Sequence, residues 1–233
     1  MCSLSYIPKK GAYILSHNRD ELPRRESSSK LVRKELEGRE LVYPKDLSAG
    51  GTWIGADSNG LSACILNGGS LSYLRNTPYR ASRGTVIPAL LELGSIEKFK
   101  GQWSSEGIEP FTLIICEGLE LWQLIHNPKE DIWQALDAQK AHFWSSTKLY
   151  HPQIRANRAT RFNHWLEQNK NPSAQELRNF HLSTQINELE GGLVLPQGFP
   201  LKTMNFCQIE KSVDKYQINY HYLDKGLRDR HIW

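Results

Sequence analysis

"SHNRDE", residues Ser16 to Glu21, ends an apolar run, "GAYILS" (residues 11–16), that has the composition of a β-strand. A histidine, an arginine and two acids thus follow closely on one another at the end of a strand near the start of the chain. Burying such side chains costs several kcal/mol for each unpaired charge, so each charge must have a partner or a task. Cys2, one expected strand earlier, offers a candidate for that task.

The composition is that of an ordinary soluble globular protein. Of the 233 residues, 39% are hydrophobic and 23% charged, and the length suits one sizeable core, so we predict a single domain over residues 1–233. No apolar run is long enough to cross a bilayer, and lysines after a short apolar stretch are the reverse of a secretory signal. We therefore expect a cytoplasmic protein without a membrane span.

The net charge of +4 is mildly basic and does not by itself indicate nucleic-acid binding. Arg155, Arg158 and Arg161 recur at every third position of an expected helix and could form a phosphate-facing stripe. A solvated helix face is the simpler interpretation of such a series. We expect no nucleic-acid partner.

The four cysteines are scattered and form no CxxC pair; they are Cys2, Cys64, Cys116 and Cys207. Tetrahedral zinc sites need closely spaced ligand pairs, and disulfides are rare in a reducing compartment. We therefore predict neither a metal site nor a disulfide. No CxxCH motif for covalent haem attachment is present.

Short strand-like runs separated by turn residues predict an antiparallel sheet in the first third of the chain. Strands are expected at residues 2–7, 11–16, 52–57, 61–67, 111–117 and 119–125, and helices at 82–99, 151–168 and 173–182. Residues 204–224 are expected to form a closing hairpin, and the charged stretch from Arg24 to Glu40 a surface excursion with little core. Strands at both ends with helices between them predict an α+β fold, with helices packed on antiparallel sheets.

Cys2 follows an initiator methionine of the kind that is normally removed when the next residue is small. Removal would leave Cys2 with its thiol and a free α-amino group, whose unperturbed pKa is about 8. That amine could take the proton of the thiol, which is the logic of enzymes with an N-terminal cysteine or threonine nucleophile. The alternative is that Cys2 is a second residue without any special role.

Four motifs together bear on this choice: the opening "MC", "NRDE" at 18–21, "GGTWIGADSNGLSACILN" at 50–67 and "SRG" at 82–84. In combination they resemble the NRDE family, whose members are similar to transport and Golgi organisation protein two. That family looks like a branch of the N-terminal-nucleophile hydrolase fold and is similar to penicillin V acylase and bile-salt hydrolase. The resemblance implies an αββα sandwich of two antiparallel sheets flanked by helices.

The resemblance also implies roles for individual residues. Asp20 would hold the α-amine of Cys2, and Arg19 would support its thiolate, since a nearby cation lowers a thiol pKa. The backbone at Asn67 would help to form an oxyanion hole. Two positions depart from the acylases: Ser146 occupies the place of an oxyanion asparagine, and Met204 that of an arginine on a late strand.

The family is associated with haem trafficking and with bacterial cytochrome maturation, so the resemblance implies a haem-binding protein. Its ligand would be haem or another small hydrophobic molecule, and its partners haemoproteins or components of cytochrome maturation. His17, Met204 and Cys2 are candidate iron ligands, and any of the other histidines could also serve. The alternative is a cysteine amidohydrolase that cleaves a non-peptide amide or acyl conjugate. Replacing one oxyanion donor typically costs about 10²–10³ in rate, which favours binding over hydrolysis.

Overall fold

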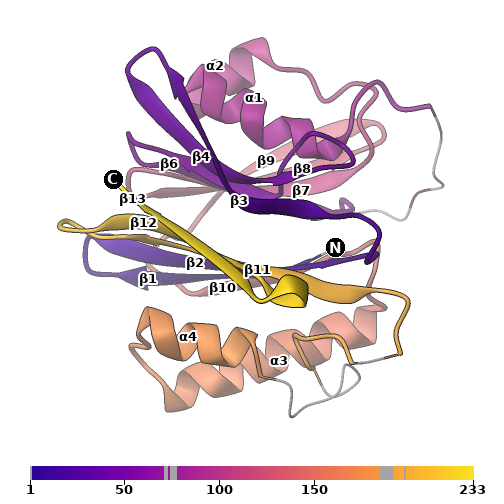
Figure 1. Ribbon diagram of the computed structural model, residues 1–233, viewed down its shortest axis with the longest axis vertical. Helices are drawn as coiled ribbons and strands as arrows, with labels where there is room; N and C mark the ends of the chain where they lie inside the picture. The colour runs from indigo at the N-terminus through magenta and orange to yellow at the C-terminus, as the bar shows by residue number, and fades with distance from the viewer. Residues whose placement is uncertain (1, 71–72, 74–77, 184–190, 197) are drawn as a thin grey trace.

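The computed structural model describes residues 2–70, 73, 78–183, 191–196 and 198–233. They form four layers, in which two antiparallel sheets lie face to face and each sheet carries two helices on its outer side (Figure 1). The predicted αββα sandwich is confirmed.

The first sheet has the strand order β10-β1-β2-β11-β12-β13. Its members are β1 (Cys2–Lys9), β2 (Ala12–Glu21), β10 (His142–Ser145), β11 (Lys202–Lys211), β12 (Tyr216–Tyr222) and β13 (Leu227–Ile232). The two ends of the chain therefore pair in one sheet, where β2 lies between β1 and β11. The hairpin expected at 204–224 is confirmed as β11 and β12.

The second sheet runs in chain order from β3 to β9. Its members are β3 (Ser27–Leu36), β4 (Arg39–Asp46), β5 (Ile54–Asp57), β6 (Leu61–Asn67), β7 (Phe111–Glu117), β8 (Glu120–Asn127) and β9 (Glu130–Leu136). The stretch from Arg24 to Glu40 was predicted as a surface excursion with little core. The low core content is confirmed, but the absence of strands is wrong, because most of the stretch forms β3 and the start of β4. Charged side chains on the exposed face hide the alternation, while Leu31 is buried.

Helices α1 (Val86–Leu93) and α2 (Ile96–Gln102) cover the second sheet, and α3 (Pro152–Gln168) and α4 (Ala174–His181) cover the first (Figure 1). The single helix predicted over 82–99 is in fact broken at Gly94, whose φ of 79° ends α1 in the left-handed region. The Ser173 and Glu176 spacing does form a capping box at the start of α4. Among the described residues, no helix is long and apolar enough to cross a membrane.

Strand alternation divides the first sheet between two cores. Leu4, Leu15 and Ile209 face the second sheet, whereas Ile7 and Ile14 pack with the helices α3 and α4. The same alternation directs neighbouring polar side chains at the end of β2 to opposite faces of the sheet, so they contact different layers.

Candidate functional site

Cys2 is the first residue of β1, a strand flanked on one side by β10 and on the other by β2. It lies directly opposite Arg19 in the register of β1 and β2 and is 2% exposed. Its side chain belongs to the core between the sheets, as do those of Leu4 and Tyr6. The predicted removal of Met1 concerns a residue outside the described ones.

Asn18, the first residue of the "NRDE" motif, ties β2 to the helical layer. Its side-chain nitrogen donates to the carbonyl oxygens of His181 and Leu193, each at 2.9 Å, and its oxygen lies 2.9 Å from Nδ1 of His181. Because all these groups are buried, the hydrogen bonds offset the free energy that burying the Asn18 side-chain amide would otherwise cost. Asn18 is thus a structural member of the motif that fixes the end of α4 on the sheet.

Arg19 points in the opposite direction, into the space between the sheets. One guanidinium nitrogen lies 2.7 Å from a carboxylate oxygen of Asp46, at the end of β4, and the other donates to Ser27 Oγ at 3.1 Å. The guanidinium also lies 4.5 Å from the ring centre of Trp53. Arg19 is 3% exposed, so these contacts compensate for the loss of water around a buried cation.

Asp20 faces the helical layer and is fully buried. Thr203 Oγ1 donates to one of its oxygens at 2.6 Å, and the hydroxyl of Tyr150 donates to the other. Burial raises the pKa of Asp20, an effect opposed by the positive charge of Arg158 and by these hydrogen bonds. Arg158 itself is buried, with its guanidinium 3.8 Å from the Tyr150 ring centre. The charge of Asp20 is therefore held by two hydroxyls and a nearby cation.

The "NRDE" motif thus has a partner for every charge. Glu21, its last member, lies 3.2 Å from the guanidinium of Arg25 and 3.8 Å from that of Arg19. A regular strand sends Arg19 and Asp20 to opposite faces. The register of β11 shifts between Thr203 and Asn205, opposite these two residues.

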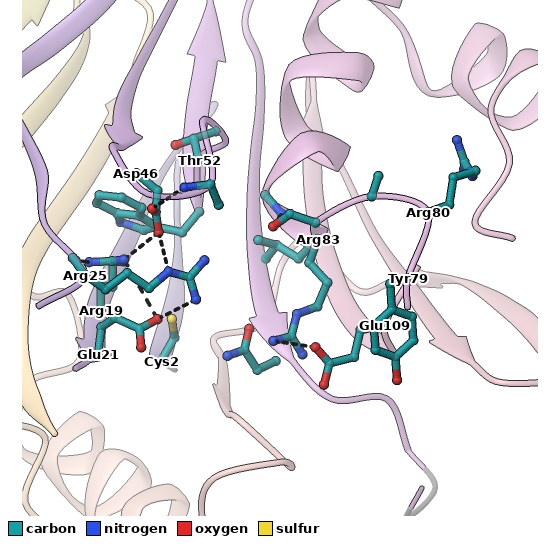
Figure 2. Close-up of a pocket in the computed structure, with 17 residues that line it drawn as sticks. Cys2, Arg19, Glu21, Arg25, Asp46, Thr52, Tyr79, Arg80, Arg83 and Glu109 are labelled. Atoms are coloured by element: carbon teal, nitrogen blue, oxygen red, sulfur yellow. Dashed lines mark hydrogen bonds and ion pairs between the residues drawn. The ribbon is translucent and has the colours of Figure 1, made fainter. Parts of the chain in front are cut away.

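A cavity of about 490 Å³ opens above Cys2. Figure 2 shows two groups of residues around it, each of them mainly charged. The first group consists of Arg19, Glu21, Arg25 and Asp46 beside Cys2, and the second of Tyr79, Arg80, Arg83 and Glu109. Apolar side chains of Ala49, Trp53, Ile65 and Ala81 complete much of the lining. We call this cavity the Cys2 pocket.

The "GGTW" and "SRG" motifs meet at the wall of the Cys2 pocket. A Cβ atom on Gly51 would lie 2.3 Å from the carbonyl carbon of Gly84, and the amide of Thr52 donates to the Gly84 oxygen at 2.8 Å. Only glycine permits two backbones to come this close. The contact places Arg83, which lies 3.3 Å from Glu109, on the same cavity as Cys2.

Burial raises the pKa of the Cys2 thiol, and the negative charge of Asp20 acts in the same direction. The positive charge of Arg19 opposes this rise in pKa without cancelling it. In the described state the thiol is therefore protonated at neutral pH. A metal ion or a base that removes this proton would convert it into a ligand or a nucleophile.

Ser146 and Asn67 are in direct contact. Ser146 Oγ donates to the backbone oxygen of Asn67 at 2.7 Å, and the Ser146 amide donates to the Cys2 oxygen at 3.0 Å. Both residues predicted for the oxyanion region thus lie beside Cys2. The hydroxyl proton of Ser146 is engaged with a carbonyl, so in this arrangement it does not serve a developing oxyanion.

His17 and Met204 are both fully buried, and neither is among the residues that line the Cys2 pocket. Met204 belongs to the core between the sheets. His17 lies between Leu4 and Cys207 in the register of its sheet, and neither of its ring nitrogens has a hydrogen-bond partner among the described residues. Burial keeps the pKa of His17 well below its ordinary value, so its imidazole is neutral.

The sequence did not single out most of the charged lining. Arg25, Asp46, Arg80 and Glu109 come from turns or strand ends that are far apart in the chain. The "SRG" motif did contain Arg83 and Gly84, and the stretch before it, "YRA" (79–81), carries Arg80. The position of these two arginines in or next to the "SRG" motif was the signal in the sequence that could have identified them as pocket residues.

Comparison with solved structures identifies folds of the same kind. The chain aligns over its full length with a Caenorhabditis elegans N-acylethanolamine-hydrolyzing acid amidase ortholog, with 11% identity, 100% of that chain covered and a TM-score of 0.66. An arginine-to-leucine variant of conjugated bile acid hydrolase from Clostridium perfringens aligns with 12% identity over 100% of this chain and 92% of the other, with a TM-score of 0.61. At this identity the likeness shows the N-terminal-nucleophile hydrolase-like fold alone.

Comparison at the level of sequence identifies the family. No curated protein sequence matches the chain significantly. The family model described as Transport and Golgi organisation 2 matches residues 1–211, which is most of the chain and includes "NRDE", "GGTW" and "SRG". The resemblance drawn from these motifs is confirmed, and the chain belongs to the Transport and Golgi organisation 2 family.

Proposed function

We propose that the protein is a cytoplasmic haem-binding carrier that holds haem reversibly in the Cys2 pocket and passes it to haemoproteins or to cytochrome maturation. The observation that carries this proposal is the lining of that pocket. The lining is largely polar, but it includes the Cys2 thiol, the apolar side chains of Trp53 and Ile65 and arginines from both groups, which offer contacts to the three parts of haem: iron, macrocycle and carboxylates.

The thiol of Cys2 supplies the iron ligand. Cysteine thiolate is an established axial ligand of haem iron, and a thiol that coordinates a metal releases its proton to water or a base. Because burial raises the pKa of Cys2, iron binding must displace a proton that the free protein holds firmly. Competition with this proton lowers the apparent affinity for iron at neutral pH below that of a preformed thiolate, which suits a carrier that has to release its cargo.

Arg80, which lines the Cys2 pocket, is the group that we assign to a haem carboxylate. Its guanidinium donates to the backbone oxygens of Glu106 and Ser104, at 2.8 and 2.9 Å, and pairs with no carboxylate among the described residues. Within the described part of the chain, no carboxylate therefore neutralises its positive charge. Guanidinium groups bind carboxylates through charge-assisted, often bidentate hydrogen bonds.

Ser146 and Met204 support binding rather than hydrolysis. The Ser146 hydroxyl donates to Asn67, and Met204 adds an apolar side chain to the core where the resemblance leads one to expect an arginine. The alternative function, hydrolysis of a non-peptide amide, is favoured by one observation: Arg19 lies opposite Cys2, with Asp20 next to it, in a fold shared with hydrolases that cleave amide-type bonds.

Titration with ferric haem tests the proposal. We expect a saturable shift of the Soret band at one haem per chain, a different spectrum for Cys2→Ala, and at least about tenfold weaker binding for Arg80→Gln, since a hydrogen bond to a charged group contributes about 1.5–3 kcal/mol. Arg228→Gln is the matched control, because Arg228 is an exposed arginine on β13 that does not line the pocket.

The roles of His17 and Met204 as iron ligands stay predictions, checked in the same titration with His17→Gln and Met204→Leu. A weak, unsaturable spectrum that is identical in Cys2→Ala would overturn the haem proposal. If the protein then cleaves N-acyl amides with a burst, and alkylation of Cys2 abolishes this activity, the protein is an amidohydrolase.

A further inference from the structure

A second cavity, of about 370 Å³, lies where strand β10 meets α3 and the second sheet. It shares no lining residue with the Cys2 pocket. Leu66, Ile125 and Trp144 give it an apolar wall, and Ser145 and Arg155 contribute polar atoms. We call it the Arg155 pocket. Its volume falls in the range of small-molecule sites, about 300–1,000 Å³.

Most polar side chains of the Arg155 pocket are already bonded to the protein. Thr112 Oγ1 donates to Gly68 O at 2.9 Å, and Thr147 Oγ1 donates to Gly69 O at 2.7 Å. The oxygen of Gln123 accepts from the indole nitrogen of Trp144 at 2.9 Å. These bonds leave those groups little capacity for a ligand.

Two polar atoms of the Arg155 pocket are different. Nε of Arg155 and Oγ of Ser145 are buried and have no hydrogen-bond partner among the described residues. A buried donor without an acceptor destabilises the folded protein. Both atoms belong to residues that line this cavity, so a ligand with acceptor oxygens would find unsatisfied donors there.

Arg155 belongs to the series that the sequence offered as a phosphate-facing stripe or a solvated helix face. Neither interpretation is right. Arg158 is fully buried, Arg155 and Arg161 are half-buried, and Arg161 donates to the Gly191 oxygen at 3.1 Å. Arg158 donates to Ser3 Oγ at 3.1 Å beneath the first sheet. The series thus serves the protein interior, and Arg155 is the member that reaches the second cavity.

We propose that the Arg155 pocket binds a monocarboxylate with a short apolar body. The carboxylate accepts hydrogen bonds from Arg155 Nε and Ser145 Oγ, and the apolar body packs against Leu66, Ile125 and Trp144. Arg155 is the single charged residue among the described residues that line the cavity, so the site selects an anion. A guanidinium presents its Nε edge as part of a fork that matches the two oxygens of a carboxylate.

Octanoate is the probe for this proposal, with 1-octanol as the comparison that keeps the apolar body and lacks the charge. Calorimetry should show one saturable octanoate site, and the fluorescence of Trp144 should change on binding, which Trp144→Phe removes. We expect octanol, and octanoate with Arg155→Gln, to bind at least about tenfold more weakly, and Ser145→Ala to weaken octanoate binding severalfold.

Arg178→Gln is the matched control, because Arg178 is also half-buried with an unpartnered Nε but does not line the cavity. Its octanoate affinity should equal that of the unchanged protein. If Arg155→Gln does not fold, Ser145→Ala and the octanol comparison decide. The proposal is overturned if octanoate shows no saturable binding at millimolar concentration, if Arg155→Gln binds it unchanged, or if octanol binds equally well.

Discussion

Asp46→Ala removes the main partner of the buried Arg19 guanidinium. Asp46 Oδ2 lies 2.7 Å from Arg19 and 2.9 Å from Arg25, and its Oδ1 accepts from the amides of Ser48 and Ala49 at 3.0 Å each. The change to alanine leaves the Arg19 charge in place, 3% exposed, while its carboxylate partner disappears.

The expected cost follows from this geometry. Breaking a buried ion pair by removing one partner costs about 3–5 kcal/mol, because the remaining charge is neither hydrated nor paired. Glu21 lies 3.8 Å from Arg19 and can take over part of the interaction, so we expect the lower end, about 3 kcal/mol. For a chain of this size the corresponding fall in Tm is about 6–12 °C.

Urea denaturation with an unchanged m-value is the assay. Glu92→Ala is the control, since Glu92 pairs with Lys34 at 2.7 Å while both side chains are 45% exposed, and its loss should change the free energy of unfolding by less than about 1 kcal/mol. A loss below about 1 kcal/mol for Asp46→Ala, equal to the control, would refute the conclusion that Arg19 is a buried charge dependent on Asp46. Asp46→Ala should also weaken haem binding in the Cys2 pocket.

Three further predictions concern the backbone, a histidine and the thiol. Gly51→Ala should destabilise the protein and loosen the Cys2 pocket, because its Cβ meets the Gly84 backbone at 2.3 Å, whereas Gly101→Ala in α2, with nothing within 4 Å, should be neutral or stabilising in the same thermal melts. Burial lowers the pKa of His181 from 6.5 to about 3. Its contribution to stability is therefore present above pH 6.5 and is lost as the pH falls toward 3, by up to about 1.4 kcal/mol per pH unit. Urea midpoints at pH 7 and pH 5 should show this loss, and the loss should be smaller in His181→Asn. Iodoacetamide should alkylate Cys2 slowly at pH 7 and faster at higher pH, because burial raises its pKa, and rapid labelling at pH 7 would contradict the protonated thiol.

Much of the fold could be predicted from the sequence. The closing hairpin, β7, β8 and the helices α3 and α4 carry clear local patterns, and the joint motifs indicated the two-sheet sandwich. The missed strands are those whose surroundings hide the pattern. Strand β9 has mostly exposed side chains, β10 has four residues, and the long charged side chains of β3 obscure its buried Leu31.

Only the part of the candidate site that the pairing of neighbouring strands brings together could be predicted from the sequence. Cys2 and Arg19 meet because β1 and β2 form a hairpin, a local event that the sequence reveals. Asp46 and Arg80 reach the same cavity through contacts between distant loops, such as the approach of Gly51 to Gly84, and no local pattern encodes such contacts. Tyr150 likewise reaches Asp20 only when the segment before α3 is packed on the sheet.

Strand β2 works as a partition between two chemical environments. One residue step, from Arg19 to Asp20, leads from the side of the first sheet that faces the Cys2 pocket to its helical side, where Tyr150 and Thr203 donate to the carboxylate. Substitutions on one side need not disturb the other, because the sheet stands between them. Groups around the Cys2 pocket could therefore be exchanged while the Asp20 carboxylate behind the strand keeps its two hydroxyl partners.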